Sequence, residues 1–188
     1  FQIEMVNKEL ENALTRKMKI NIATIRRASK DLIGNIIRTP TIRSQNLSSE
    51  INGEVFLKLE NLQYTSSFKV RGAYTSITRL KEEQKKMGVI AMSAGNHAQA
   101  VAWWAKKERV NATIVMPEHA PLFKVMKTKS LGADVILRGR TLNESQTYVS
   151  ELVNDKKLTL IHPYDDSNVV IGQGTLGLEF IEDIKDLD

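Results

Sequence analysis

Residues 89–104 read VIAMSAGNHAQAVAWW, in which a loop of small residues separates two largely apolar runs. The apolar run from Val89 to Met92 is typical of a buried strand, and the run from Ala98 to Trp104 is typical of a helix. The loop of small residues between them therefore lies at a helix N-terminus, where backbone N–H groups are unpaired and the helix dipole is positive. Such a loop can bind an anion such as a carboxylate, and Gly95 permits close approach of the backbone.

The same alternation of strand and helix extends along the chain. Apolar runs predict strands at residues 55–59, 89–92, 112–116, 134–137 and 158–161. Periodic segments predict helices at residues 22–33, 67–80, 98–107, 122–131, 141–153 and 174–184. Strands that alternate with helices of this length form βαβ units. The expected fold class is therefore α/β, a three-layer sandwich with a mostly parallel sheet and helices on both faces.

A second segment, TSSFKVRGA at residues 65–73, precedes the first by about one βα unit. Lys69 in this segment lies beside Phe68 and Val70. Partial desolvation by such neighbours would lower the pKa of the lysine amine toward neutrality, which makes the amine a nucleophile able to form a Schiff base. Lysines of this kind usually hold pyridoxal phosphate, so Lys69 is the candidate catalytic residue.

Two other motifs suggest different chemistry. Ser66 and Lys69 also satisfy the Ser-x-x-Lys pattern of penicillin-recognising proteins, but the Ser-x-Asn and Lys-Thr-Gly elements of that chemistry are missing. Residues 172–177, GQGTLG, match the dinucleotide pattern G-x-G-x-x-G. That pattern requires a following βαβ unit with an acidic residue about 20 positions further on. We interpret these glycines instead as allowing a tight turn into a packed helix.

Composition limits the expected partners. Hydrophobic residues make up 41% of the chain and charged residues 26%, which is typical of a globular protein. The net charge of +5 is dispersed among acidic residues, as in KEEQKK at residues 81–86, so no nucleic-acid partner is expected. No apolar run reaches the roughly 18 residues of a membrane span and no signal peptide is evident, so the expected location is the cytoplasm, with no membrane partner. His97, His119 and His162 lack the spacing of metal ligands, so no metal site is expected.

The segments at residues 65–73 and 89–104 resemble motifs of the serine/threonine dehydratases. These enzymes belong to the fold-type II, tryptophan-synthase-beta-like pyridoxal-phosphate enzymes. Further segments are similar to dehydratase segments in the same order, at residues 36–41, 55–61, 112–117, 132–135, 162–166 and 172–175. The resemblance runs from about Met18 to the C-terminus and covers the N-terminal portion of the family's chain. It implies pyridoxal 5'-phosphate as the cofactor.

The resemblance also implies roles within the site. Lys69 would be the catalytic lysine, Phe68 would pack close to the cofactor ring, and the Asn96 amide would hydrogen-bond the phenolic oxygen of the cofactor. The residues implied to bind the substrate carboxylate are Ser93, Gly95, Asn96 and His97. From the sequence alone, Phe68 is simply a core aromatic residue, and Asn96 could cap the helix as well as contact the cofactor.

The activity that the resemblance implies is the conversion of a small hydroxy amino acid, threonine or serine, to a 2-oxo acid and ammonia. Lys69 would first hold the cofactor and then abstract the α-proton of the substrate. Ala94 stands where serine racemases of this family place a hydroxyl, and alanine cannot carry a proton, so elimination is favoured over racemisation. A serine racemase, another fold-type II enzyme and a non-catalytic binding or interaction remnant of the fold are the alternatives.

The resemblance also predicts the domain organisation. Residues 1–17 would be an N-terminal extension that forms an amphipathic helix. Residues 18–63 and 152–188 would form part of a large domain, and residues 64–151 would form a small domain inserted in it. Family members continue with a loop that cradles the cofactor phosphate, so we expect this chain to be an N-terminal fragment of a homo-oligomeric enzyme.

Overall fold

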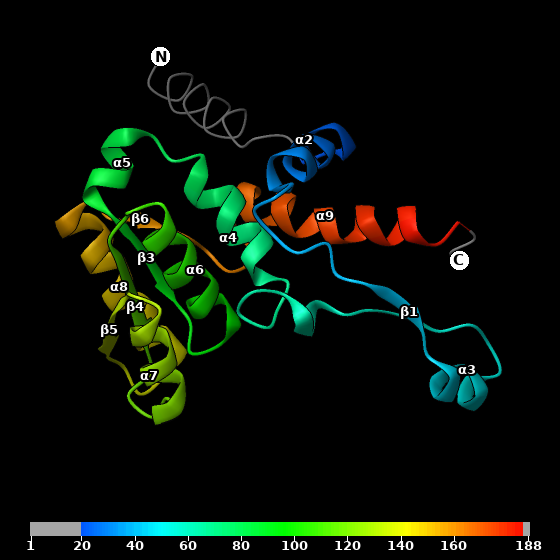
Figure 1. Ribbon diagram of the computed structural model, residues 1–188. Coiled ribbons are helices and arrows are strands. Elements are labelled where there is room, and N and C mark those ends of the chain that lie inside the picture. The colour runs from blue at the N-terminus through cyan, green and yellow to red at the C-terminus, as the bar shows by residue number, and fades with distance from the viewer. Residues whose placement is uncertain (1–19, 186–188) are drawn as a thin grey trace, which may run out of the picture.

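The computed structural model describes residues 20–185, so the helix predicted within residues 1–17 lies outside the described residues. Figure 1 shows the order of the elements. The helices are α2 (Ile22–Leu32), α3 (Gln45–Ile51), α4 (Lys69–Thr78), α5 (Glu82–Met87), α6 (Asn96–Lys107), α7 (Leu122–Ser130), α8 (Leu142–Lys156) and α9 (Ser167–Asp183), with the short 3-10 helix η1 (Glu60–Leu62). The strands are β1 (Thr41–Arg43), β2 (Phe56–Lys58), β3 (Val89–Met92), β4 (Ala112–Met116), β5 (Asp134–Leu137) and β6 (Thr159–Leu160).

Four strands form a parallel sheet in the order β5-β4-β3-β6. Successive side chains of a strand point to opposite faces, and both faces of a parallel sheet have to be covered. On one face, Ile90 and Val115 pack against Val149 and Leu152 of α8. The alternate strand residues pack on the other face in a second cluster that includes α6 side chains such as Val101. The predicted three-layer α/β fold is thus confirmed.

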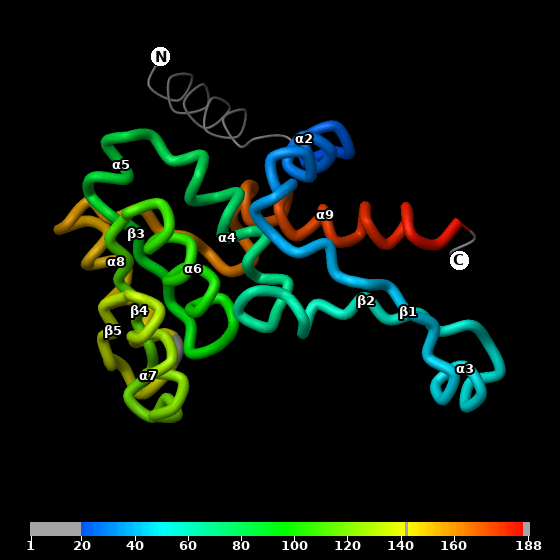
Figure 2. The backbone as a smooth tube through the Cα atoms, viewed as in Figure 1, coloured from blue at the N-terminus to red at the C-terminus, as the bar shows by residue number. Residues whose placement is uncertain are grey.

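The strands β1 and β2 form a separate antiparallel pair, in which Thr41 lies opposite Lys58. This pair and α3 extend away from the four-stranded sheet, as Figure 2 shows. The strand predicted at residues 55–59 is therefore present, but it is not a strand of the parallel sheet. The three residues of β1 carry no apolar run, so the sequence does not predict this strand.

The last helix begins earlier than the sequence predicts, because α9 already starts at Ser167. Asp166 caps it, and the Asp166 carboxylate accepts hydrogen bonds from the backbone N–H groups of Asn168 (2.7 Å) and Val169 (3.1 Å). Residues 172–177 consequently lie inside a helix. The interpretation of their glycines as a tight turn is wrong, and a loop that wraps a dinucleotide phosphate is not formed there.

These glycines allow α9 to pack directly on α4. A Cβ atom at Gly172 would lie 2.5 Å from the carbonyl oxygen of Arg71 and 2.6 Å from the Cα atom of Gly72. A Cβ atom at Gly72 would in turn lie 2.8 Å from the carbonyl oxygen of Val169. The two backbones therefore touch through glycines on both helices, and this contact fixes the start of α4, which carries Lys69.

The parallel sheet extends past residue 151, the expected end of the small domain, because β6 pairs with β3. Helix α4 lies in the predicted small domain and packs on α6 of that domain, but it also packs on α9 and α2 of the predicted large domain. The domain boundaries therefore remain a prediction.

Candidate active site

The loop before α4 is held in an unusual backbone conformation. Thr65 and Ser66 have φ angles of 44° and 56°, in the left-handed region that residues other than glycine rarely adopt. Gln63 is buried beneath this loop, and its carbonyl oxygen accepts the N–H of Ser66 at 2.8 Å. The Gln63 side chain also accepts the N–H of Ile37 (3.0 Å) and donates to the Ile37 carbonyl oxygen (2.7 Å). These contacts fix the entry of the chain into α4.

Lys69 is the first residue of α4, and its side chain is half-buried. The Lys69 Nζ atom donates a hydrogen bond to the carbonyl oxygen of Pro163 at 2.9 Å and lies 5.2 Å from the centre of the Phe68 ring. Burial lowers the pKa of Lys69 below its ordinary value. The partial desolvation predicted from the sequence is therefore present, and it increases the fraction of neutral amine available as a nucleophile or base.

The start of α6 is open toward an incoming group. Gly95 is the N-cap and has no side chain to accept from the N–H groups of the first turn, which contains no acidic residue. Ser93 Oγ accepts the N–H of Gly95 at 3.1 Å, and a Cβ atom added to Gly95 would meet only that oxygen, at 3.9 Å. Asn96 is exposed at the first helical position, so its interpretation as the helix cap is wrong. The positive end of α6 is thus accessible to an anion.

His97 differs from its neighbours because its side chain is only 3% exposed. The Nε2 atom of the ring lies 2.9 Å from the carbonyl oxygen of Ile161, and Nδ1 has no hydrogen-bond partner among the described residues. Burial lowers the pKa of His97 to about 4, and the nearby charge of Lys69 acts in the same direction. The ring is therefore neutral at neutral pH, which argues against its use as an acid.

A buried ion network holds the first turns of α4, and the sequence analysis missed it. Arg71 is fully buried, and its guanidinium group hydrogen-bonds both carboxylate oxygens of Glu60 (2.7 and 3.0 Å) and both of Glu179 (2.7 and 3.0 Å). Lys58 Nζ adds ion pairs to Glu179 and Asp183, each at 3.0 Å. The only signal in the sequence is a charged residue within each of several otherwise apolar segments.

The network shifts the pKa values of its members. Burial alone would lower the pKa of Arg71, but hydrogen bonds to Glu60 and Glu179 raise it overall. Burial alone would raise the pKa of Glu179, but hydrogen bonds from Arg71 and Lys58 lower it overall. Each charge is thus stabilised by its partners, and the network ties α4 to η1 and to α9.

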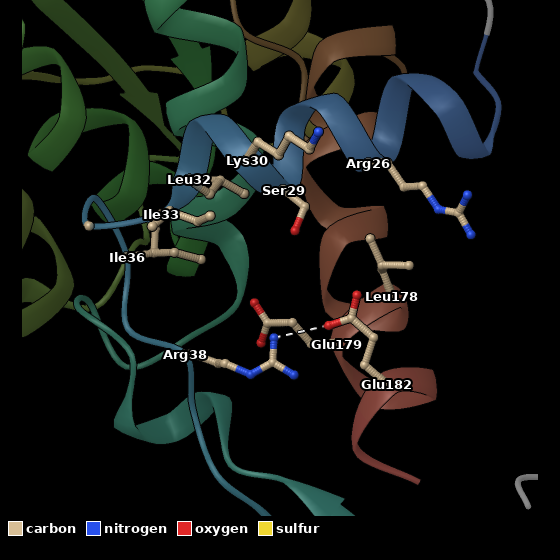
Figure 3. A pocket seen from close by; sticks show the side chains of 11 residues that line it. Arg26, Ser29, Lys30, Leu32, Ile33, Ile36, Arg38, Leu178, Glu179 and Glu182 are labelled. Carbon is tan, nitrogen blue, oxygen red and sulfur yellow. Dashed lines mark hydrogen bonds and ion pairs between the residues drawn. The ribbon is translucent and has the colours of Figure 1, made fainter. Parts of the chain in front are cut away.

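Two cavities among the described residues lie away from Lys69 and the start of α6. One of about 540 Å³ lies between parts of α2 and α9 (Figure 3), with Arg26 and Lys30 on α2 and Glu182 on α9. Arg38 reaches across it to Glu182 at 3.1 Å. A second, of about 250 Å³, lies beside α8 and includes Pro163 in its lining. Neither cavity is lined by Lys69 or by residues 93–97.

No helix in residues 20–185 combines the length and apolarity needed to cross a membrane. In the same residues no three His, Asp or Glu side chains gather where they could hold a metal ion.

The groups around Lys69 fit pyridoxal phosphate. The cofactor needs an amine for its aldehyde and hydrogen-bond donors for its oxygens. Lys69 would supply the amine, and the hydroxyl oxygens of Thr65 and Ser67, just before it, are buried without a partner among the described residues. The unoccupied space at Gly95 leaves room for a ligand at the start of α6. The site thus offers an amine, unpaired hydroxyls and a positive helix end.

Comparison with curated proteins agrees with this assignment. The L-threonine dehydratase catabolic TdcB of Staphylococcus aureus (strain USA300) is 51% identical to the chain over 166 residues, which is 88% of this chain and 48% of that protein. The same protein of strain N315 is 50% identical over the same length. The chain thus spans about half the length of the curated relatives that it matches.

Solved structures agree as well. The serine racemase of Dictyostelium discoideum matches with a TM-score of 0.83 and 36% identity, over 90% of this chain and 55% of that one. The processed form of threonine deaminase isoform 2 from Solanum lycopersicum matches with a TM-score of 0.80 and 35% identity, over 92% and 49%. A family model described as "Pyridoxal-phosphate dependent enzyme" matches residues 32–188. Since that match covers most of the chain and includes Lys69 and the start of α6, the chain belongs to the family of pyridoxal-phosphate-dependent enzymes.

Proposed function

We propose that the intact protein is a pyridoxal-phosphate-dependent ammonia-lyase that converts threonine or serine to a 2-oxo acid and ammonia. The observation that carries this proposal is the amine of Lys69, which is partly desolvated, donates a hydrogen bond to the carbonyl oxygen of Pro163 and lies close to the start of α6. The 51% identity to the Staphylococcus protein named as a catabolic threonine dehydratase supports the choice of reaction.

Lys69 has two tasks in this proposal. Pyridoxal phosphate, when bound, supplies an electron sink for the bonds to the α-carbon of the substrate. Lys69 Nζ holds the cofactor covalently and, after the substrate amine replaces it, takes the α-proton. The lowered pKa of Lys69 favours the neutral amine that this second task requires. The Pro163 carbonyl keeps the amine in place by accepting a hydrogen bond from it.

The start of α6 would bind the substrate carboxylate. Ser93, Gly95, Asn96 and the backbone N–H of His97 lie around this helix N-terminus, where a negative charge is stabilised by the helix dipole. The exposed Asn96 side chain would hydrogen-bond the phenolic oxygen of the cofactor. Phe68 is 39% exposed, so its interpretation as a core aromatic residue is wrong. Adjacent to Lys69, it would pack against the cofactor ring.

Ala94 favours elimination over racemisation. Proton transfer to the opposite face of the substrate would need an acid there, and the methyl group of Ala94 has no acidic proton to transfer. The match to the Dictyostelium serine racemase makes racemisation the second candidate. Assays of the purified protein with L-threonine and L-serine should release 2-oxo acid and ammonia. Faster interconversion of L- and D-serine than release of 2-oxo acid would favour the racemase.

Covalent attachment at Lys69 tests the core of the proposal. The intact protein is mixed with pyridoxal phosphate, its visible absorbance is recorded before and after borohydride reduction, and the modified peptide is identified by mass. We expect the adduct on Lys69, its loss in Lys69→Ala, and its retention in Lys86→Ala, which changes an exposed lysine of α5. An unchanged absorbance band in Lys69→Ala would contradict the proposal.

Two further expectations concern the whole protein. The catabolic role named for the Staphylococcus relative fits a cytoplasmic enzyme. We also expect a homo-oligomer, which light scattering of the intact protein would test. If the intact protein is a monomer, the prediction of a homo-oligomer is wrong and the proposed role of Lys69 is unaffected.

A further inference from the structure

The segment from Ile161 to Pro163 connects the two helices of the candidate site. The Ile161 N–H donates to the carbonyl oxygen of Ile90 at 2.8 Å, just beyond the end of β6. The Ile161 carbonyl oxygen instead faces Nε2 of His97, in the first turn of α6, at 2.9 Å. Two residues later, the Pro163 carbonyl oxygen accepts the amine of Lys69, also at 2.9 Å. One short segment therefore holds a side chain from each helix.

This segment has little conformational freedom. Proline fixes its own φ angle, and the residue before a proline is restricted to extended conformations. His162 is further fixed because its Nδ1 atom accepts the N–H groups of Tyr164 (3.3 Å) and Asp165 (2.8 Å). Between the two carbonyls, the φ angle of Pro163 is therefore fixed and both backbone angles of His162 are restricted, so a change in the orientation of the Ile161 carbonyl is transmitted to the Pro163 carbonyl.

The His97 ring is held in one form. A carbonyl oxygen can only accept a hydrogen bond, so the short contact with Ile161 requires the proton to be on Nε2. Nδ1 is then an acceptor, and it is buried without a partner among the described residues. Burial, which leaves only 3% of the residue exposed, favours the neutral ring. His97 therefore makes one directed side-chain hydrogen bond, to the Ile161 carbonyl.

We propose that His97 is a positioning residue for Lys69: its Nε2–H group orients the Ile161 carbonyl and thereby fixes the Pro163 carbonyl that holds the lysine amine. The proposal rests on the proposed function only in that Lys69 is the amine that reacts. It assigns the imidazole a role distinct from that of the His97 backbone N–H, which would bind the substrate.

Two substitutions separate this role from simple packing. His97→Gln keeps an N–H donor near the position of Nε2, whereas His97→Met fills a similar volume and has no donor. Both variants place a neutral side chain in the same buried space. If His97 acts by packing alone, the two substitutions should have similar effects. If His97 positions Lys69, His97→Gln should keep most of the wild-type behaviour that His97→Met loses.

The first readout is the reactivity of Lys69 in the intact protein without cofactor. Limited reaction with acetic anhydride is followed by peptide mass, and the rate at Lys69 is divided by the rate at the exposed Lys86. We expect His97→Met to raise this ratio roughly 3- to 10-fold, the range for release of one hydrogen bond. His97→Gln should lie near the wild type. An unchanged ratio in His97→Met overturns the proposal.

The second readout uses the enzyme loaded with pyridoxal phosphate. A displaced lysine should lower kcat of His97→Met roughly 10- to 100-fold, because small misplacements of a reacting group are costly. KM should change less than about twofold if substrate binding is unaffected. The melting temperature of each variant is measured in parallel. A lower melting temperature with unchanged kcat per bound cofactor overturns the proposal, as do equal losses in both variants.

The two proposals fail in different ways. If borohydride fixes no adduct on Lys69 in the wild type, the proposed function is wrong, and the acetylation ratio still decides whether His97 positions the amine. If the adduct forms but His97→Met behaves like the wild type in both readouts, the proposed function stands and the positioning role is wrong.

Discussion

Helices α4 and α6 both begin at the candidate site, but different interactions hold them there. The first turns of α4 are fixed by Arg71, whose charge is compensated by two buried carboxylates. The first turn of α6 is fixed by the neutral ring of His97, and no carboxylate lies in that turn. The first turn of α6 thus carries no carboxylate of its own that would compete with an anion for its backbone N–H groups.

This difference has an energetic consequence. Buried charges that lose their partner are strongly destabilising, because desolvation of the remaining charge is no longer offset. A neutral hydrogen bond contributes less to stability, although it can direct a reacting group as well as a charged one does. Changes in the α4 anchor should therefore act mainly on folding, and changes in the α6 anchor mainly on the reaction.

The largest expected effect is that of Arg71→Met. It leaves Glu60 and Glu179 facing each other in the interior without their shared cation. We expect the free energy of unfolding to fall by about 3–5 kcal/mol, measured by chemical denaturation. Arg140→Met, at a residue whose side chain is 87% exposed, should change it by less than about 0.5 kcal/mol. Equal effects of the two substitutions would show that the network does not hold α4.

The pH dependence of stability distinguishes the two anchors. The pKa of His97 is lowered from 6.5 to about 4 in the folded protein, mainly by burial. The unfolded chain therefore binds this proton at higher pH, so the contribution of His97 is fully present above about pH 7 and is lost as the pH falls toward 4. The full loss is about 3 kcal/mol. The pKa of Glu179 is lowered overall, so its contribution persists below the ordinary range of a glutamate.

Chemical denaturation between pH 7.5 and pH 4.5 tests this difference. The wild type should lose stability across the interval, and His97→Gln should lose less because it does not titrate. His119→Gln, at an exposed histidine, is the matched control and should follow the wild type. If His97→Gln retains the full pH dependence, the loss comes from other groups.

Substitution of a glycine at the contact between α4 and α9 should have a smaller effect on the free energy of unfolding. Gly172→Ala would place a methyl group 2.5 Å from the Arg71 carbonyl oxygen, so the helices would have to separate. We expect a loss of about 1–3 kcal/mol in the free energy of unfolding. Gly177→Ala lies in the same helix with nothing within 4 Å, and it should stabilise the protein by up to about 1 kcal/mol. Stabilisation by both would contradict the close packing.

Local features of this site were predictable from the sequence. The strand, loop and helix at residues 89–107 form as expected, since each is encoded by neighbouring residues. The lowered pKa of Lys69 follows from its apolar neighbours and agrees with the structure. The start of α9 was not predictable, because glycines at residues 172–177 look like a turn until the partner helix is known.

The anchors themselves could not be predicted, because their partners are distant in the chain. Arg71 and Glu179 are 108 residues apart, and His97 and Ile161 are 64 residues apart. A charged residue in a helix is ordinarily expected to be exposed. A histidine in the sequence gives no indication that a distant backbone carbonyl is its hydrogen-bond partner. Only the packing of α4, α6 and α9 brings these groups together.

The smallest expected effect concerns the loop that leads into α4. Ser66 has a φ angle of 56°, where glycine has no steric penalty, but glycine also raises the entropy of the unfolded chain. Ser66→Gly should therefore change the free energy of unfolding by less than about 1 kcal/mol. Arg109→Gly relieves a φ angle of 57° far along the chain from Lys69 and is the matched control. If the loop also positions Lys69, only Ser66→Gly should alter the rate of cofactor attachment. Equal rates in both variants would mean that the loop does not position Lys69.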